Sequence, residues 1–271
     1  MGFLTSIKKT FNISGAEVSV ATDDDIHSQG DRVSGRVTVR AGEYLQKGSS
    51  IWLELKEFWT ETHSAGKYGS TTETVMEARE NVSLASDFSI QPGSEESQEF
   101  EVRLPMNCRI STEDTGWRLV VTMDMPSAVD PTGEVILVVY PAEEFVAIIQ
   151  ACDQILRFRG DFTPQWEDSS STTSFRLVPP EVLKSELDSL HLNLFLDSEG
   201  AVTGTLIFDL EEESVFDYFK AIFGRDDIKR PLALSLDEIF DSDGHANSDA
   251  IARPIGRALE EVLSERRAKG R

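Results

Sequence analysis

Residues 87–105 read DFSIQPGSEESQEFEVRLP, and this stretch decides the fold class. Apolar residues alternate with polar ones on both sides of a Pro-Gly pair, at Phe88, Ile90, Phe100, Val102 and Leu104. Side chains two residues apart share one face of a strand, so each half predicts a strand with one buried face. Pro92-Gly93 predicts a turn, because proline presets φ and glycine allows positive φ. Pro105 lacks an N–H group and predicts the end of the second strand. The pattern is typical of a half-buried antiparallel sheet and favours a binding scaffold over an enzyme.

Similar alternation recurs through the first half of the chain. It predicts strands near 16–20, 33–39, 50–59, 73–84, 86–91, 98–104, 117–124 and 135–140. Residues 61–74 are polar and rich in Gly, Ser and Thr, so a mobile hairpin or loop is expected there. Short strands separated by turn signals at steady intervals indicate a β-sandwich.

The pattern changes at Pro141, where apolar residues recur at helical spacing up to residue 157. A polar loop is expected over 160–174, a hairpin over 190–208 and a helix over 214–223. This mixture indicates an α+β domain. The domain prediction is therefore a sandwich with a short N-terminal helix over 1–140, an α+β domain (or a second sandwich) over 141–236, and a flexible segment with a terminal helix over 237–271.

Composition excludes several classes of protein. The 271 residues carry a formal net charge of -22, whereas nucleic-acid binders usually show a clustered basic face. The acidity also disfavours adsorption to anionic membranes. Cys108 and Cys152 lie in different predicted domains and outside any CxxC pair, so neither a disulfide framework nor a cysteine-built zinc site is expected. The start of the chain lacks the apolar region of a signal peptide, and a cytoplasmic location is expected.

Motifs for catalysis are missing from the sequence. The four histidines have no metal-ligand partner at i+3 or i+4, and neither a Walker A loop nor Gly-x-Ser-x-Gly occurs. The acidic stretches Asp23–Asp25 and Asp241–Gly244 are interpreted as solvated loops rather than calcium sites, because the EF-hand spacing is not met. The chain is therefore expected to be no enzyme and to need no metal or cofactor.

Two amphipathic helices are the candidate partner-binding elements. The first is expected over residues 3–11, with an apolar face made of Phe3, Leu4, Ile7 and Phe11. That face packs on the chain's own sandwich, in a partner's groove or on a membrane surface. The second is expected over 254–268, with an apolar stripe made of Ile255, Leu259, Val262 and Leu263. Residues 253–271 hold six Lys/Arg and three Asp/Glu, so this helix is expected to fold back on an acidic surface of its own protein or of a neighbouring subunit.

Several motifs in order resemble one known family. Residues 30–39 resemble the second-strand motif of arrestin-like domains, and residues 88–105 resemble their Phe-x-Ile-x-Pro-Gly hairpin. Residues 117–132 and the opening residues 1–18 are similar to the closing and opening segments of the arrestin-like bacterial sporulation-control M proteins. The resemblance covers about residues 1–140.

The resemblance implies a non-catalytic cytoplasmic adaptor that controls sporulation, development or cell division through protein contacts. It implies partners among division or envelope-associated proteins and no nucleic acid. Two alternatives stay open: a membrane-peripheral trafficking or stress-response scaffold, and an enzyme with an unrecognised site. Peripheral membrane contact and homo-oligomerisation stay open with them.

Overall fold

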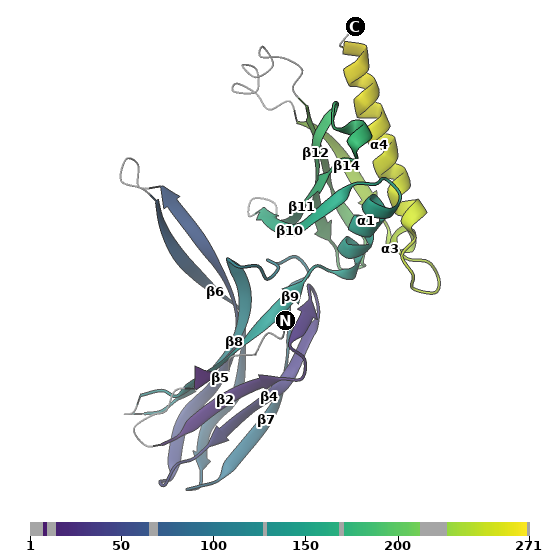
Figure 1. Cartoon of the computed structure of the whole chain (residues 1–271). Helices are drawn as coiled ribbons and strands as arrows, with labels where there is room; N and C mark the ends of the chain where they lie inside the picture. The colour runs from purple at the N-terminus through teal and green to yellow at the C-terminus, as the bar shows by residue number, and fades with distance from the viewer. Residues whose placement is uncertain are drawn as a thin grey trace. The chain divides into compact units, whose positions relative to one another are not determined.

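The computed structural model describes residues 8–9, 15–64, 70–126, 129–167, 171–211 and 227–269. The chain forms two compact units (Figure 1). Unit 1 holds residues up to Pro105 together with Arg109–Tyr140, and unit 2 holds Met106–Cys108 together with Pro141–Arg271.

Unit 1 is a sandwich of two sheets. The larger sheet has the order β1-β9-β8-β5-β6, with β3 pairing in parallel on β9. Its strands are β1 (Lys8–Lys9), β3 (Ile26–Ser28), β5 (Gln46–Ser64), β6 (Ser70–Ile90), β8 (Thr115–Asp124) and β9 (Thr132–Tyr140). The smaller sheet has the order β2-β4-β7 and consists of β2 (Glu17–Thr22), β4 (Arg32–Arg40) and β7 (Glu95–Arg103).

The core of unit 1 follows the two-residue period of its strands. In β8 the inward residues Trp117, Leu119, Val121 and Met123 are all fully buried. In β5 the buried residues Ile51, Leu53 and Leu55 alternate with more exposed neighbours, as the sequence predicts. Fully burying such a side chain contributes about 1.5–3 kcal/mol, so the alternating apolar faces supply most of the stabilisation.

The turn at Pro92-Gly93 joins two sheets rather than two paired strands. Gly93 has a φ of +69°, and the Ser94 N–H donates to the Gln91 carbonyl, as a tight turn requires. However, β6 pairs with β5, and β7 pairs with β4. The hairpin prediction is therefore wrong in its pairing. The alternation predicts which side of each strand faces the core. It does not predict which strands pair, because both sheets of a sandwich bury their inner faces in the same core.

The polar stretch 61–74 is largely strand. β5 and β6 remain paired from Lys56↔Ala78 to Ser64↔Ser70 and extend as a two-stranded ribbon past the last pairing of β5 with β8, at Trp59↔Thr115 (Figure 1). Only residues 65–69 of this stretch lie outside the described residues. Composition predicted a loop here because a ribbon that is solvated on both faces needs no apolar alternation.

Unit 2 is α+β. Its antiparallel sheet has the order β10-β11-β12-β13-β14, formed by Arg159–Glu167, Thr172–Val178, Leu187–Leu196, Val202–Leu210 and Ile228–Leu234. A 3-10 turn (Glu181–Leu183) precedes β12, and the described helices are α1 (Glu143–Gln154), α3 (Leu236–Ile239) and α4 (Ser248–Lys269). The predicted hairpin is present with Leu196 opposite Val202. The prediction of a sandwich followed by an α+β domain and a terminal helix is confirmed.

Two local predictions for unit 2 are wrong. Residues 160–174 contain most of β10 and the start of β11 instead of a loop. β10 is an edge strand of this sheet, and Thr172, Thr173 and Ser174 at the start of β11 are polar residues that the fold buries. The terminal helix begins at Ser248, not Pro254, because Asn247 caps it by accepting a hydrogen bond from the Ala250 N–H. The segment from residue 237 up to α4, predicted to be flexible, contains the end of α3 and a bridge between Phe240 and Ala246, and its flexibility stays a prediction.

Two predicted helices fall mostly or wholly on residues that the structure does not describe. The helix over 214–223 lies entirely outside the described residues. Of the helix over 3–11, only Lys8 and Lys9 are described, and they pair with Glu134 and Gly133 as the strand β1. The helix prediction is wrong at these two positions. Phe3, Leu4, Ile7 and Phe11 lie outside the described residues.

Gly35 is a position where the sandwich requires the smallest residue. A Cβ at this position would lie 2.2 Å from the Ala21 carbonyl oxygen and 2.8 Å from the Phe100 ring. We expect Gly35→Ala to destabilise unit 1 by about 1–3 kcal/mol, since either the ring or the strand must shift. Urea unfolding followed by tryptophan fluorescence measures the change.

Gly256→Ala is the matched control for Gly35→Ala. The nearest atom to an added Cβ there is the Leu156 Cδ2, at 3.4 Å, and the residue lies inside α4. Replacing a helical glycine by alanine is expected to leave stability unchanged or raise it by up to about 1 kcal/mol. Equal effects of the two substitutions would contradict the close packing at Gly35.

Candidate functional site

A carboxylate lies where β5 should carry another apolar residue. Glu57 continues the inward series Ile51, Leu53, Leu55, and it is 1% exposed. β5 pairs with β8 on one side and β6 on the other, so Glu57 lies opposite Trp117 and Glu77. Sequence reasoning missed this residue. The signal was available, because the same two-residue period that identifies the core places Glu57 in it.

Two arginines neutralise this carboxylate. The Glu57 Oε2 accepts hydrogen bonds from the Arg79 Nε at 2.8 Å and Nη2 at 2.5 Å, and lies 3.3 Å from the Arg109 Nη1. The Glu57 Oε1 accepts from the backbone N–H of Arg109 at 3.0 Å. Arg79 reaches it from a bulge in β6, between the pairs Leu55↔Glu80 and Lys56↔Ala78.

Two tryptophans complete this group, which we call the Glu57 cluster: Glu57, Arg79, Arg109, Trp59 and Trp117. The Arg109 guanidinium lies 3.8 Å from the centre of the Trp59 ring, a cation–π contact. The Trp117 Nε1 donates to the Arg109 carbonyl at 2.7 Å. Arg109 is thus held through its main chain and its side chain, and the cluster fixes this part of the chain, just before β8, against β5. The arrangement is structural and offers no reactive group to solvent.

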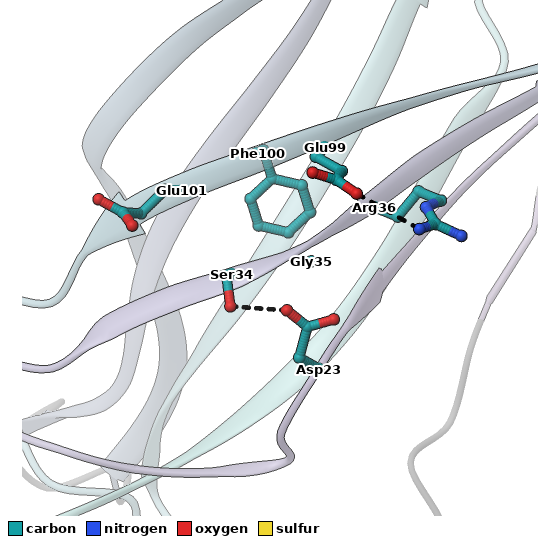
Figure 2. Close-up of a pocket in the computed structure, with 7 residues that line it drawn as sticks. All are labelled: Asp23, Ser34, Gly35, Arg36, Glu99, Phe100 and Glu101. Atoms are coloured by element: carbon teal, nitrogen blue, oxygen red, sulfur yellow. Dashed lines mark hydrogen bonds and ion pairs between the residues drawn. The ribbon is translucent and has the colours of Figure 1, made fainter.

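A hollow of about 450 Å³ opens at the smaller sheet of unit 1 (Figure 2). Its lining residues come from β4, from β7 and from the position that follows β2: Asp23, Ser34, Gly35, Arg36, Glu99, Phe100 and Glu101. The Ser34 Oγ donates to the Asp23 carboxylate at 2.7 Å, and Arg36 pairs with Glu99 at 3.5 Å (Figure 2). A ligand would have to break these pairs before it could bind, so the hollow is a weak candidate for a small-molecule site.

The outer face of the smaller sheet carries a charge ladder. Arg32 pairs with Glu101, Arg36 with Glu99 and Arg40 with Glu95, and the hydroxyls of Thr38 and Ser97 lie 3.0 Å apart. All these groups are well exposed, so each ion pair stabilises the fold by at most about 1 kcal/mol. Their combined effect is to hold the register between β4 and β7.

Unit 2 brings together a serine, a histidine and an aspartate that do not form a catalytic relay. The Ser189 Oγ lies 3.2 Å from the His191 Nε2 and donates to the Asp209 Oδ2 at 3.4 Å. Ser189 is fully buried, and the aspartate contacts the serine instead of orienting the imidazole. Burial lowers the pKa of His191 and raises the pKa of the Asp209 carboxyl. Both shifts disfavour charge at this position.

In the acidic loop at Asp241 of unit 2, the carboxylate accepts hydrogen bonds from backbone N–H groups of the same loop. Asp241, Asp243 and His245 are exposed and close together. The Asp241 carboxylate accepts the backbone N–H groups of Asp243 and His245, both at 2.9 Å. These bonds, with that from His245 the largest effect, hold the pKa of Asp241 below its usual value. They make the loop a side-chain-stabilised turn.

The apolar stripe of the terminal helix belongs to the core of unit 2. Ile255 and Val262 are fully buried, and Leu259 and Leu263 are 8% and 6% exposed. Ion pairs hold the C-terminal end of α4 within the same unit: Arg267 makes two hydrogen bonds to Glu186, at 2.6 and 2.8 Å, and Glu265 of α4 pairs with Arg230 of β14. Of the two alternatives, the chain's own surface is the one that α4 contacts. Burial leaves these four residues no face for a partner, which corrects their assignment as partner-binding residues.

The two cysteines are also core residues. Cys108 and Cys152 are both buried. Burial raises the pKa of the Cys152 thiol to about 12, so the thiolate is strongly disfavoured. A reactive role for this thiol has no support from its surroundings.

Taken together, the sandwich and the α+β unit define an arrestin-like, mainly β protein. A family model described as SpoOM protein matches residues 5–208, and the chain therefore belongs to the SpoOM protein family. The resemblance to sporulation-control M proteins is confirmed. No curated protein matches the chain.

A solved structure supports the fold. The crystal structure of Spo0M, sporulation control protein, from Bacillus subtilis matches with a TM-score of 0.67 and 18% sequence identity. The match covers 92% of this chain and 98% of that chain. At this identity the likeness shows a shared fold. Among the described helices, none has the length and apolar character needed to cross a membrane.

The Glu57 cluster predicts a large effect of a small substitution. Glu57→Gln removes the negative charge that two arginines share, one of them with a side chain only 6% exposed. We expect a loss of about 3–5 kcal/mol, because an unpaired buried charge is left behind. Chemical unfolding monitored by tryptophan fluorescence provides the measurement.

Glu101→Gln serves as the matched control for the cluster. Glu101 pairs with Arg32 where both side chains are more than half exposed, so less than about 1 kcal/mol is expected. A Glu57→Gln protein as stable as this control would show that the cluster does not hold the fold.

The lowered pKa of His191 predicts a pH dependence for unit 2. The unfolded chain binds a proton near pH 6.5, whereas the folded state resists protonation. Stability should therefore decrease as the pH falls through about 6.5, and His191→Gln should flatten this slope. Hydrogen exchange of unit 2 amides between pH 5 and 8, corrected for intrinsic rates, measures the slope.

Proposed function

We propose that this chain is a non-catalytic regulatory protein of sporulation control that acts as an adaptor through contacts with other proteins. Membership of the SpoOM protein family over residues 5–208 is the observation that carries the proposal. The structural likeness to a protein described as a sporulation control protein supports the regulatory role.

The chemistry of the described residues supports action by binding instead of catalysis. The Glu57 carboxylate is neutralised by arginines, and the hollow at the smaller sheet contains charges that already pair with one another. The serine beside His191 is sealed from solvent. Catalytic groups need access to a substrate and a matched proton donor or acceptor, and none of these three groups has both.

Protein contacts are favoured over membrane contacts. A net charge of -22 disfavours contact with anionic lipid, which a membrane role of the N-terminal residues would need. Division or envelope-associated proteins reached from the cytoplasm are the partners that the proposal expects.

Deletion in the chain's own host tests the regulatory role. We expect fewer heat-resistant spores, restored by the wild-type chain. A double variant, Ser189→Ala with His191→Gln, should restore spore counts equally well at equal protein level, because the proposed function needs no catalysis. Wild-type counts after deletion would contradict the role in sporulation, and failure of the double variant at normal abundance would contradict the non-catalytic mechanism.

Affinity purification after light crosslinking tests the adaptor mechanism. We expect mass spectrometry to detect co-purifying proteins that are lost from a mock purification and from a strain carrying only the tag. If the chain alone is recovered under conditions in which it restores sporulation, the adaptor mechanism is wrong.

A further inference from the structure

β6 offers an unusually long open edge in the described part of the chain. It spans Ser70–Ile90, and β5 is the one described strand that pairs with it. At the opposite edge of the same sheet the strand β9 is covered, because β1 and β3 both pair with it. An open edge presents backbone N–H and C=O groups in the geometry that another strand can use.

The edges of the sheet in unit 2 carry the usual protection. β10 contains Pro164, where its pairing with β11 shifts register, and β14 contains Pro231. A proline interrupts the row of donors and prevents a further strand from adding in register. β6 contains no proline along its 21 residues.

One segment of β6 is regular enough to act as a template. Bulges interrupt the strand after Ala78 and again between Ser83 and Ala85. From Ser70 to Ala78, however, each residue pairs with successive residues of β5 from Ser64 to Lys56 without a shift. Nine residues in one register are enough for a strand of ordinary length. We call this segment, Ser70–Ala78, the open edge.

The side chains of the open edge determine what fits it. Its sequence, STTETVMEA, has three threonines and a valine, which favour strands, and contains no lysine, the residue that commonly protects exposed edges. Its two charged residues, Glu73 and Glu77, are both exposed. Glu77 pairs with Arg79 at 2.9 Å, whereas Glu73 lies opposite another carboxylate, Glu61 of β5. Met76 is 44% exposed and adds an apolar contact. The edge thus suits an extended segment with basic and apolar residues in alternation.

Charge also decides between a partner and a second copy of the chain. Two copies paired through β6 would bring four glutamates of two acidic edges together, and each chain carries a net charge of -22. Like charges directly opposite each other destabilise paired strands. A basic segment has the opposite sign and gains from the same field.

We propose that Ser70–Ala78 of β6 binds an extended, basic segment of a partner protein as an added strand. This inference rests on the proposed adaptor function and assigns its contact surface and the chemistry of its partner. Main-chain hydrogen bonds to β6 supply the pairing, and Glu73, with Glu61 opposite it on β5, selects the basic side chains.

A defined peptide tests the proposal on the full chain. The probe is an acetylated and amidated nine-residue peptide of alternating valine and lysine. We expect it to slow hydrogen exchange of amides within 70–78 at least tenfold, with no such change in β14. The same peptide with alternate backbone nitrogens methylated keeps its charge but loses donors, and should give no protection. Equal protection by both peptides, or none by either, would overturn the proposal.

Charge substitutions test the selection of basic side chains. Thr71→Lys with Glu73→Lys should weaken binding of the valine-lysine peptide about tenfold at low salt. The matched control is Glu260→Lys with Ser264→Lys, which makes the same change of charge on the exposed side of α4. Equal weakening by both pairs would show general attraction to an acidic protein and contradict the assignment.

Self-association and the biological role are separated by two further readouts. Protection of 70–78 without peptide, together with a dimer in analytical ultracentrifugation, would make a second copy the occupant and overturn the proposal. If the peptide fails to bind but deletion still reduces spore counts, the edge proposal is wrong and the regulatory function stands. If the peptide binds as expected and deletion leaves spore counts unchanged, the regulatory function is wrong and the edge proposal stands.

Discussion

A strand can bury only every second side chain, and both units of this protein are built on that constraint. In unit 1 the inward residues of β5, β8 and β9 face those of β2, β4 and β7, so that two sheets share one apolar core. In unit 2 the leucines of β12 alternate with His191 and Asn193, and α4 contributes a buried apolar stripe. The charged residues are left for the outer faces, where they pair across strands.

Glu57 is the informative exception to this rule. A buried carboxylate costs several kcal/mol unless it is paired, and here the pairing partners come from a β6 bulge and from the segment before β8. The exception therefore joins three parts of unit 1 that are distant in sequence. A hydrophobic residue at the same position would be satisfied by any apolar neighbour, whereas Glu57 demands two particular arginines, which gives the corner a defined geometry.

Whether polar groups already have partners inside the chain also indicates which surface can bind another protein. The polar groups of the hollow, of the loop at Asp241 and of the Ser189–His191 contact have partners within the chain. The backbone groups on the outer side of β6 differ, since β5 uses only one side of that strand. A regulatory protein that works by contact needs such a surface, and a sheet edge offers affinity through the main chain and selectivity through alternate side chains.

The sequence by itself determined the identity of the buried faces, the change from β to α+β near Pro141, and the family. These follow from local periodicity and from ordered motifs, both of which are properties of consecutive residues. Tertiary structure alone decided which strands pair, that the Pro92-Gly93 turn crosses between sheets, that polar stretches at 60–64, 70–74 and 160–167 form strands, and that the stripe at Ile255 and Leu259 is core. Pairing joins residues far apart in the chain, and an amphipathic face looks the same in sequence whether its own fold or a partner covers it.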